Sequence, residues 1–199
     1  MTRPSHFDTD LFDRGVFVRL SGVDAGYGDS AILRGVDFEA RKGEVALVSG
    51  PEAAGKSTLI HLLRLALAPR AGRAVILGAD AARAGPRGRA RVKRRVGYVA
   101  ENPVFVEQWS AFENIALPLK MRGIRARDYT QDVRELVDFV GLGAGAADLA
   151  VDTLSAAEQR RVAIARALAA KPDLILADDP TAGMSPAEGR RMVRLLAEM

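Results

Sequence analysis

The sequence of 199 residues has no cysteine, only two histidines and a single tryptophan. Without cysteine there is no disulfide framework and no thiolate metal or redox centre, and two histidines are too few to build a zinc site. Long apolar runs are also missing. The longest one, residues 59–68, is interrupted by His61 and Arg64 and is far shorter than the roughly 20 residues that span a bilayer. We therefore expect a core helix there.

The N-terminal residues are polar and charged and contain no apolar segment of the kind found in a signal peptide. This predicts a polar tail, 1–15, on a protein that stays inside the cell. The net charge of +4 informs association and not fold. Residues 83–95 contain seven Lys or Arg and no acidic residue. Such a run can meet phosphates, anionic lipid or an acidic partner, but we expect a solvated loop. It lacks interleaved aromatics, which argues against nucleic-acid binding.

Strand-like and helix-like segments alternate along the chain, which predicts an α/β fold with helices on the faces of a sheet. A turn is expected at Tyr27, Gly28 and Asp29. Apolar residues between 129 and 140 recur with helical spacing, and Gly141 is placed to end that helix. The region 103–166 is therefore a predicted helical insertion. The predicted strands are 16–23, 36–40, 44–49, 74–77, 96–100 and 174–177.

The most informative motif follows the short apolar run 44–49, EVALVS, which is typical of a buried strand. It is a glycine-containing loop followed at once by a predicted helix, 56–68, that Pro69 and Gly72 end. The motif fits G-x-x-x-x-G-K-[ST], in which backbone N–H groups cradle phosphates, the lysine reaches the β and γ oxygens and the serine hydroxyl meets magnesium. The predicted nucleotide-binding residues are Gly50, Pro51, Glu52, Ala53, Ala54, Gly55, Lys56, Ser57 and Thr58.

A pair of functional carboxylates is also expected, directly after the apolar run 174–177, LILA. Asp178 ends this predicted strand, where a carboxylate can hold the magnesium shell of a bound nucleotide. Asp179 follows as the candidate that polarises the attacking water. Alone this pattern is weak, because many strands end in a turn aspartate. Combined with the phosphate loop it indicates Mg-ATP chemistry.

The segment 154–161, LSAAEQRR, opens a predicted helix with a capping box formed by Ser155 and Glu158. Together with the phosphate loop and the LILADD run, it resembles the signature of the ATP-binding-cassette (ABC) family. The resemblance covers about 16–199 and implies a P-loop NTPase (RecA-like) α/β core with an antiparallel β subdomain and an inserted α-helical subdomain. It implies one nucleotide-binding domain, 16–199, with a core of 16–102 and 167–199 and a helical subdomain of 103–166.

Within the family, the stretches FENIALPL (112–119), RRVGYV (94–99) and LADDPT (176–181) look most like the cell-division ATP-binding protein FtsE and its relatives in lipoprotein and macrolide export. The resemblance implies ATP and Mg²⁺ as cofactors and a head-to-tail homo- or heterodimer. It also implies an integral membrane partner, FtsX-like or an exporter permease, and a location on the inner face of the cell membrane. By similarity Tyr27 stacks on adenine, Glu101 lies at the Q-loop position near the metal, and Ser155, Ala156 and Ala157 reach the γ-phosphate of the opposite subunit.

Several residues depart from the family pattern. Glu101 replaces a glutamine, Ala156 and Ala157 replace two glycines, and Ser185 replaces an aspartate. Ser185 nevertheless forms, with Glu188, a predicted capping box that opens a final helix. Asp179 stands where the family has glutamate, and a displacement of about 1 Å at a reacting centre can cost on the order of 100-fold in rate. The family's switch histidine has no counterpart within these 199 residues. Two hypotheses follow: a slow ATPase that drives a membrane partner, or a non-hydrolysing nucleotide-binding module or truncated cassette.

Overall fold

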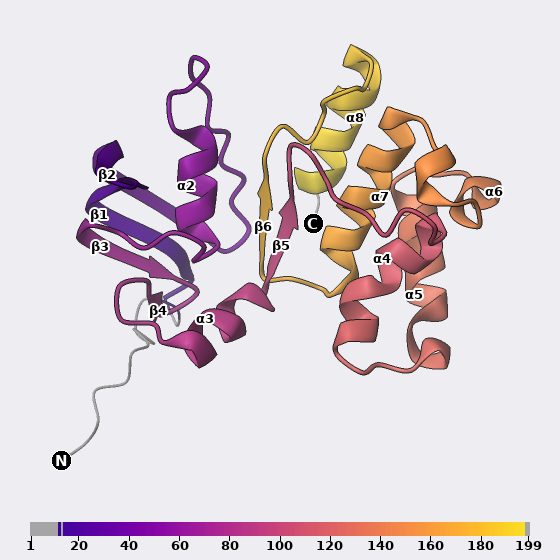
Figure 1. Ribbon diagram of the computed structural model, residues 1–199, viewed down its shortest axis with the longest axis horizontal. Helices are drawn as coiled ribbons and strands as arrows, with labels where there is room; N and C mark the ends of the chain where they lie inside the picture. The colour runs from indigo at the N-terminus through magenta and orange to yellow at the C-terminus, as the bar shows by residue number, and fades with distance from the viewer. Residues whose placement is uncertain (1–11, 13, 198–199) are drawn as a thin grey trace. The chain divides into compact units, whose positions relative to one another are not determined.

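The computed structural model describes residues 12 and 14–197, so most of the predicted polar tail lies outside the described residues. The contacts of the chain divide it into two units, one ending at Arg94 and the other beginning at Arg95. Each unit has its own sheet and its own helices (Figure 1). Among the described residues, no helix combines the length and apolar character needed to cross a membrane.

The first unit contains a four-stranded antiparallel sheet with the strand order β2-β1-β3-β4. Alternating apolar residues of the central strand β1 point into the core, where Val18, Leu20 and Val23 are buried. Helix α2 packs against β1 and β2 (Figure 1) and buries Leu59 and Leu62. The elements of this unit are β1 (Val16–Tyr27), β2 (Ser30–Arg41), α2 (Lys56–Leu63), β3 (Ala71–Ile76), β4 (Ala79–Asp80) and α3 (Pro86–Lys93).

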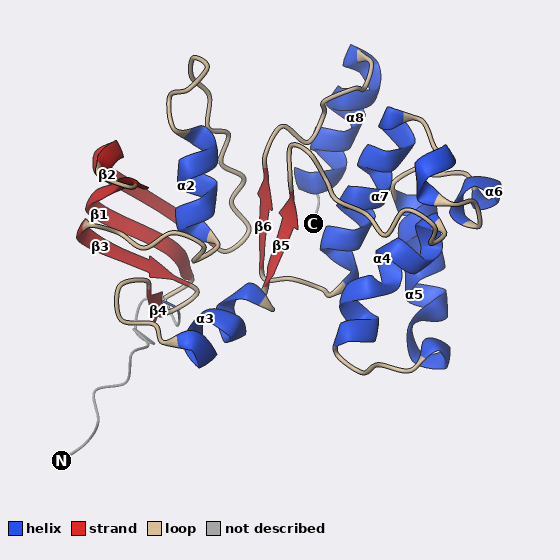
Figure 2. Cartoon of the chain, in the orientation of Figure 1, coloured by secondary structure: helices blue, strands red, loops and turns tan. Residues whose placement is uncertain are grey.

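The strand predicted at 44–49 is wrong for this structure. These residues form an exposed loop before α2 (Figure 2), and Leu47 is 90% exposed. A strand needs a neighbour that pairs with its backbone groups, and the strands of the first unit pair with one another instead. The predicted strands that became β1, β2 and β3, and the turn after Tyr27, are confirmed.

One helix prediction and one loop prediction also need correction. The helix predicted over 56–68 ends at Leu63, and Leu65 has a left-handed φ of 55° that no α-helix continues through. The basic segment expected as a solvated loop contains the helix α3, which starts at Pro86. Its Arg89 guanidinium donates to the carbonyl oxygens of Ala84 (2.9 Å), Leu65 (3.4 Å) and Ala81 (3.4 Å), so part of the basic run serves the fold.

The second unit contains two parallel strands, and its helices lie to one side of them, with α7 packed against β5 (Figure 2). Val96 lies opposite Leu174 and Val99 opposite Ala177, so both strands end at the same edge. The predicted helical region is confirmed as helical. The elements are β5 (Val96–Val99), α4 (Ala111–Met121), α5 (Ala126–Phe139), α6 (Ala144–Ala147), the 3-10 turn η1 (Val151–Thr153), α7 (Ala156–Ala169), β6 (Leu174–Ala177) and α8 (Pro186–Ala197).

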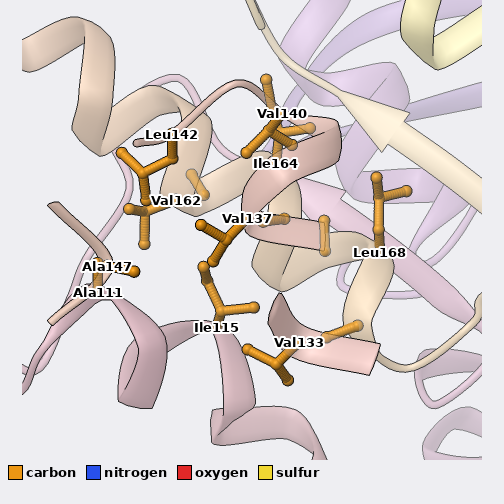
Figure 3. Packing of buried hydrophobic residues seen from close by; sticks show 14 of the residues in the cluster. Ala111, Ile115, Val133, Val137, Val140, Leu142, Ala147, Val162, Ile164 and Leu168 are labelled. Atoms are coloured by element: carbon orange, nitrogen blue, oxygen red, sulfur yellow. The ribbon is translucent and has the colours of Figure 1, made fainter. Parts of the chain in front are cut away.

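Helix α7 is the centre of the second core. It buries residues on most of its circumference, including Val162, Ile164 and Leu168, and it packs against α4, α5 and β5. Ile115 of α4 and Val133 of α5 lie in the same cluster (Figure 3). Because the interior is close-packed, small residues in α7 let its neighbours approach closely.

Three helices of this unit begin with a serine and a glutamate that cap each other. The boxes are Ser110 with Glu113 in α4, Ser155 with Glu158 in α7, and Ser185 with Glu188 in α8. The two boxes predicted from sequence, those of α7 and α8, are confirmed. Each box satisfies backbone N–H groups that the helix itself leaves without a partner.

Gly97 is the point at which β5 and α7 come closest. A Cβ atom added there would lie 2.5 Å from the carbonyl oxygen of Ala167 and 2.9 Å from Cγ of Pro172. We expect Gly97→Ala to lower the free energy of unfolding by about 1–3 kcal/mol, because the backbone carbonyl must move to admit the methyl group. Chemical denaturation measures the change.

Gly145→Ala is the matched control. Gly145 lies in α6 with open space around the position of an added Cβ, so alanine should leave stability unchanged or raise it slightly. Equal effects of the two substitutions would contradict the close approach at Gly97.

Candidate functional site

The phosphate-loop residues form an exposed turn that leads directly into α2. Two features bend the backbone there: Ala53 has φ 60° and Gly55 has φ 92°. A Cβ atom at Gly55 would lie 3.0 Å from side-chain carbons of both Ile32 and Leu33, so glycine is required by conformation and by space. Gly55 therefore fixes how the loop enters the helix.

The first turn of α2 differs from the self-capped helices of the second unit. Among the described residues no side chain caps it, and it holds no acidic residue. The first intrahelical bond runs from the N–H of Leu59 to the oxygen of Gly55 (2.9 Å). The preceding N–H groups and the positive end of the helix dipole thus remain available to an anion.

Lys56 reaches back over the same loop. Its Nζ donates to the carbonyl oxygens of Gly50 (3.0 Å) and Pro51 (2.7 Å). Ser57 is exposed on the next position of α2, whereas Thr58 is buried. The ammonium group, the serine hydroxyl and the uncapped helix end therefore lie within one turn, as phosphate binding requires.

Tyr27 lies at the tip of the β1–β2 hairpin and is 47% exposed. Its hydroxyl oxygen lies 2.5 Å from Nδ1 of His61, one residue of α2. The two rings are nearly perpendicular, with an interplanar angle of 87° and centroids 6.3 Å apart. The structure thus brings the predicted adenine-stacking residue onto the phosphate-loop helix. His61 was not predicted for this role, because nothing in the local sequence links it to Tyr27.

In the second unit, the predicted acidic residues gather at one edge of the parallel strand pair. Glu101 follows β5, and Asp178 and Asp179 follow β6. The N–H of Asp178 donates to the oxygen of Val99 at 2.9 Å, which continues the pairing past the end of β6. Asp179 is exposed and has φ 45°, a left-handed conformation that aspartate adopts more readily than most residues.

Arg160 of α7 binds the backbone at this edge, a role that no sequence motif indicated. This buried arginine donates through Nη1 to the oxygen of Ala100 and through Nη2 to the oxygen of Glu101, both at 2.6 Å. A planar guanidinium can make two such bonds at once. The backbone at Glu101 is thereby tied to the helix that begins at Ser155.

The predicted signature residues Ser155, Ala156 and Ala157 form the start of α7, with Ser155 and Ala156 exposed. The Ser155 hydroxyl donates to the carboxylate of Glu158 at 2.6 Å, and the N–H of Ser155 donates to the same oxygen at 2.9 Å. These hydrogen bonds, with the serine hydroxyl first, lower the pKa of Glu158. The carboxylate is therefore ionised at neutral pH, and a negative charge already lies at this helix end.

The donor types suit magnesium. Ser57 supplies a hydroxyl oxygen, and Asp178 and Glu101 supply carboxylate oxygens, which are the hard ligands that Mg²⁺ prefers. Among the residues that the structure describes, no three His, Cys, Asp or Glu side chains form a metal-binding group. Mg²⁺ at nucleotide sites is held by one or two protein ligands together with phosphates and water. The hydroxyl of Ser57 in the first unit and the carboxylates of Asp178 and Glu101 in the second are each of the type that it takes.

Comparison with known proteins places the arrangement in a family. Residues 33–182 match the ABC transporter family model, which is well over half of the chain. The chain is 42% identical over 190 residues to the lipoprotein-releasing system ATP-binding protein LolD of Ruegeria sp. (strain TM1040), covering 92% of the chain and 83% of that protein. It is 38% identical over 185 residues to LolD 2 of Caulobacter vibrioides, covering 90% and 81%.

Solved structures with a similar fold are also ATP-binding cassettes. The dimeric post-hydrolysis structure of the ATP-binding cassette MJ0796 bound to ADP and Pi matches with a TM-score of 0.82 and 27% identity, over 90% of this chain and 81% of that one. The fold is that of a P-loop NTPase cassette. The chain therefore belongs to the ABC transporter family, as an ATP-binding subunit of the ATP-hydrolysing class. The family prediction is confirmed, but these lipoprotein-releasing relatives do not support its FtsE-like, cell-division part.

Substitution of Arg160 tests the hydrogen bonds that connect α7 to the backbone at Ala100 and Glu101. Arg160→Ala should lower the free energy of unfolding by about 1.5–3 kcal/mol, because a charged donor is lost and two carbonyl oxygens lose their partner. Arg190→Ala, an exposed position on α8, should change it by less than about 0.5 kcal/mol. Urea denaturation followed by circular dichroism compares the two, and an equal loss in both would contradict the role of Arg160.

Proposed function

We propose that this chain binds Mg-ATP at the start of α2 and hydrolyses it to drive a membrane-embedded permease of the lipoprotein-releasing type. The observation that carries the proposal is the uncapped first turn of α2 behind the left-handed Gly55. An anion placed there accepts hydrogen bonds from backbone N–H groups that have no other described partner, and the positive end of the helix dipole stabilises its charge. Similarity to the LolD proteins of lipoprotein-releasing systems supports a lipoprotein as the cargo.

In this proposal the phosphates of ATP bind along 50–58, and Lys56 exchanges its two loop carbonyls for phosphate oxygens. Tyr27 stacks on the adenine. Both roles use residues of the first unit that the structure already orients, so binding needs little rearrangement there. Ordered groups lose less entropy when the ligand arrives.

Ser57, Asp178 and Glu101 would hold Mg²⁺, which supplies charge neutralisation for the developing phosphate oxygens. Asp179 orients and polarises the attacking water. Its left-handed backbone and short side chain set where its carboxylate can reach. We infer slow turnover, because the aspartate reaches one methylene less far than glutamate would.

The proposed working unit is a head-to-tail dimer in which Ser155, Ala156 and Ala157 approach the nucleotide of the other subunit. The MJ0796 cassette is a dimer, which supports this assembly. We propose one nucleotide-binding domain over 16–199 with a helical part at 103–166, located peripherally on the inner face of the membrane. An FtsX-like partner is the alternative to a lipoprotein-releasing permease.

The start of α7 favours a second candidate function, a nucleotide-binding module that does not hydrolyse ATP. The ionised carboxylate of Glu158 caps this helix, and Ala156 and Ala157 are its first two residues. Like charge repels a phosphate, and methyl groups limit its approach to the backbone. Turnover separates this candidate from the ATPase.

The deciding experiment measures ATP binding and single-turnover hydrolysis with Mg²⁺ for the chain, Lys56→Ala and Asp179→Asn. Lys56→Ala should weaken ATP binding by about 10-fold or more, because a charge-assisted contact is lost. Asp179→Asn should keep binding and lower the hydrolysis rate by about 100-fold or more, because the general base is lost.

Asp179→Glu is the matched control for reach, and it should raise the rate above that of the unchanged chain. Lys56-dependent binding without turnover, alone or with a co-purified permease, would replace the ATPase proposal by the non-hydrolysing module. Binding that ignores Lys56→Ala would contradict the nucleotide site itself.

A further inference from the structure

The β1–β2 hairpin ends in a tightly constrained tip. Tyr27 pairs with Ser30 across a two-residue turn, in which Gly28 has φ 50°. A Cβ atom at Gly26 would lie 1.9 Å from the carbonyl oxygen of Ser30, so only glycine fits beneath the turn. The backbone that carries Tyr27 is therefore fixed, and only the side-chain torsions remain free.

Other contacts attach this tip to α2 and to the segment after it. The guanidinium of Arg70 donates to the carbonyl oxygen of Gly28, and the N–H of Arg70 donates to the oxygen of Asp24 (2.8 Å). Close to the turn, Gly55 approaches Ile32 and Leu33. The hairpin tip and the start of α2 thus form one connected structure within the first unit.

His61 occupies a specific place on α2. It follows Ser57 by four residues, so the two share a helix face with a separation of about 6 Å along the axis. The carbonyl oxygen of His61 accepts from the N–H groups of Ala66 (2.9 Å) and Leu67 (3.1 Å) where the helix ends. The backbone of His61 is therefore also fixed, and its imidazole offers Tyr27 a stationary partner.

The contact with His61 uses the hydroxyl of Tyr27 and leaves its ring faces to other partners. The perpendicular rings and the distance of 2.5 Å between the hydroxyl oxygen and Nδ1 place the imidazole at the edge of the phenol. Tyr27 remains 47% exposed. A tyrosine held by its hydroxyl has lost rotamer freedom before any ligand arrives, so stacking on its face costs less entropy.

We propose that His61 is a positioning residue that holds the ring of Tyr27 for stacking on the base of the nucleotide whose phosphates bind at the start of α2. This inference rests on the proposed nucleotide site and deepens it. The pair recognises a planar ring and not a bare polyphosphate. Because the hydrogen bond involves no atom of the ligand, His61 acts on base affinity only through Tyr27.

The test measures equilibrium binding of Mg-ATP and of Mg-tripolyphosphate to the full chain by isothermal titration calorimetry. His61→Leu should weaken ATP binding by about 2- to 12-fold, the equivalent of one hydrogen bond, and leave tripolyphosphate binding unchanged. His61→Asn, whose amide can replace Nδ1, should restore ATP affinity. Tyr27→Phe should reproduce the loss of His61→Leu, and the double variant should lose no more than either single one.

Additive losses in the double variant, or an equal loss of tripolyphosphate binding in His61→Leu, would overturn the positioning role. Tyr27→Phe removes a single oxygen atom and so tests the same hydrogen bond if the His61→Leu variant folds poorly. The nucleotide site itself would be contradicted if the unchanged chain bound neither ligand, or if the Lys56→Ala variant bound both ligands as tightly as the unchanged chain. The inference about His61 would then fail with it.

Discussion

The proposed nucleotide site in the first unit depends on a set of backbone N–H groups that no described side chain caps. Gly55 turns the chain into α2 in a conformation that only glycine adopts easily, and no described side chain caps the first turn. Lys56 folds back over the loop and keeps its charge beside those groups. A buried helix end normally acquires partners, so an exposed and uncapped one is suited to a ligand.

Three helices of the second unit differ from α2 because side chains cap their first turns. In α4, α7 and α8 a serine and a glutamate satisfy the same kind of N–H groups locally. At α7 this cap lies at the segment that resembles the family signature, and it brings the Glu158 carboxylate to the helix end. The cap stabilises the helix, but its charge opposes a phosphate. Membership of the ABC transporter family and slow turnover are therefore compatible.

Tertiary ties connect these local pieces within each unit. Arg160 joins α7 to the backbone that follows β5, and Gly97 allows β5 and α7 to approach. In the first unit, Tyr27 and His61 join the hairpin tip to α2. A family comparison alone does not reveal such ties, because each one joins residues far apart in the sequence. They are also the contacts through which residues outside the reacting groups can affect binding.

Local sequence patterns were enough to predict the strands that became β1, β2, β3, β5 and β6, and the capping boxes at Ser155 and Ser185. These features are set by neighbours within a few residues, so local patterns suffice. The folded chain was needed to show that 44–49 is an exposed loop, that α2 ends at Leu63, and that His61 contacts Tyr27. Strand pairing, helix termination and side-chain contacts depend on partners that the chain brings together only when it folds.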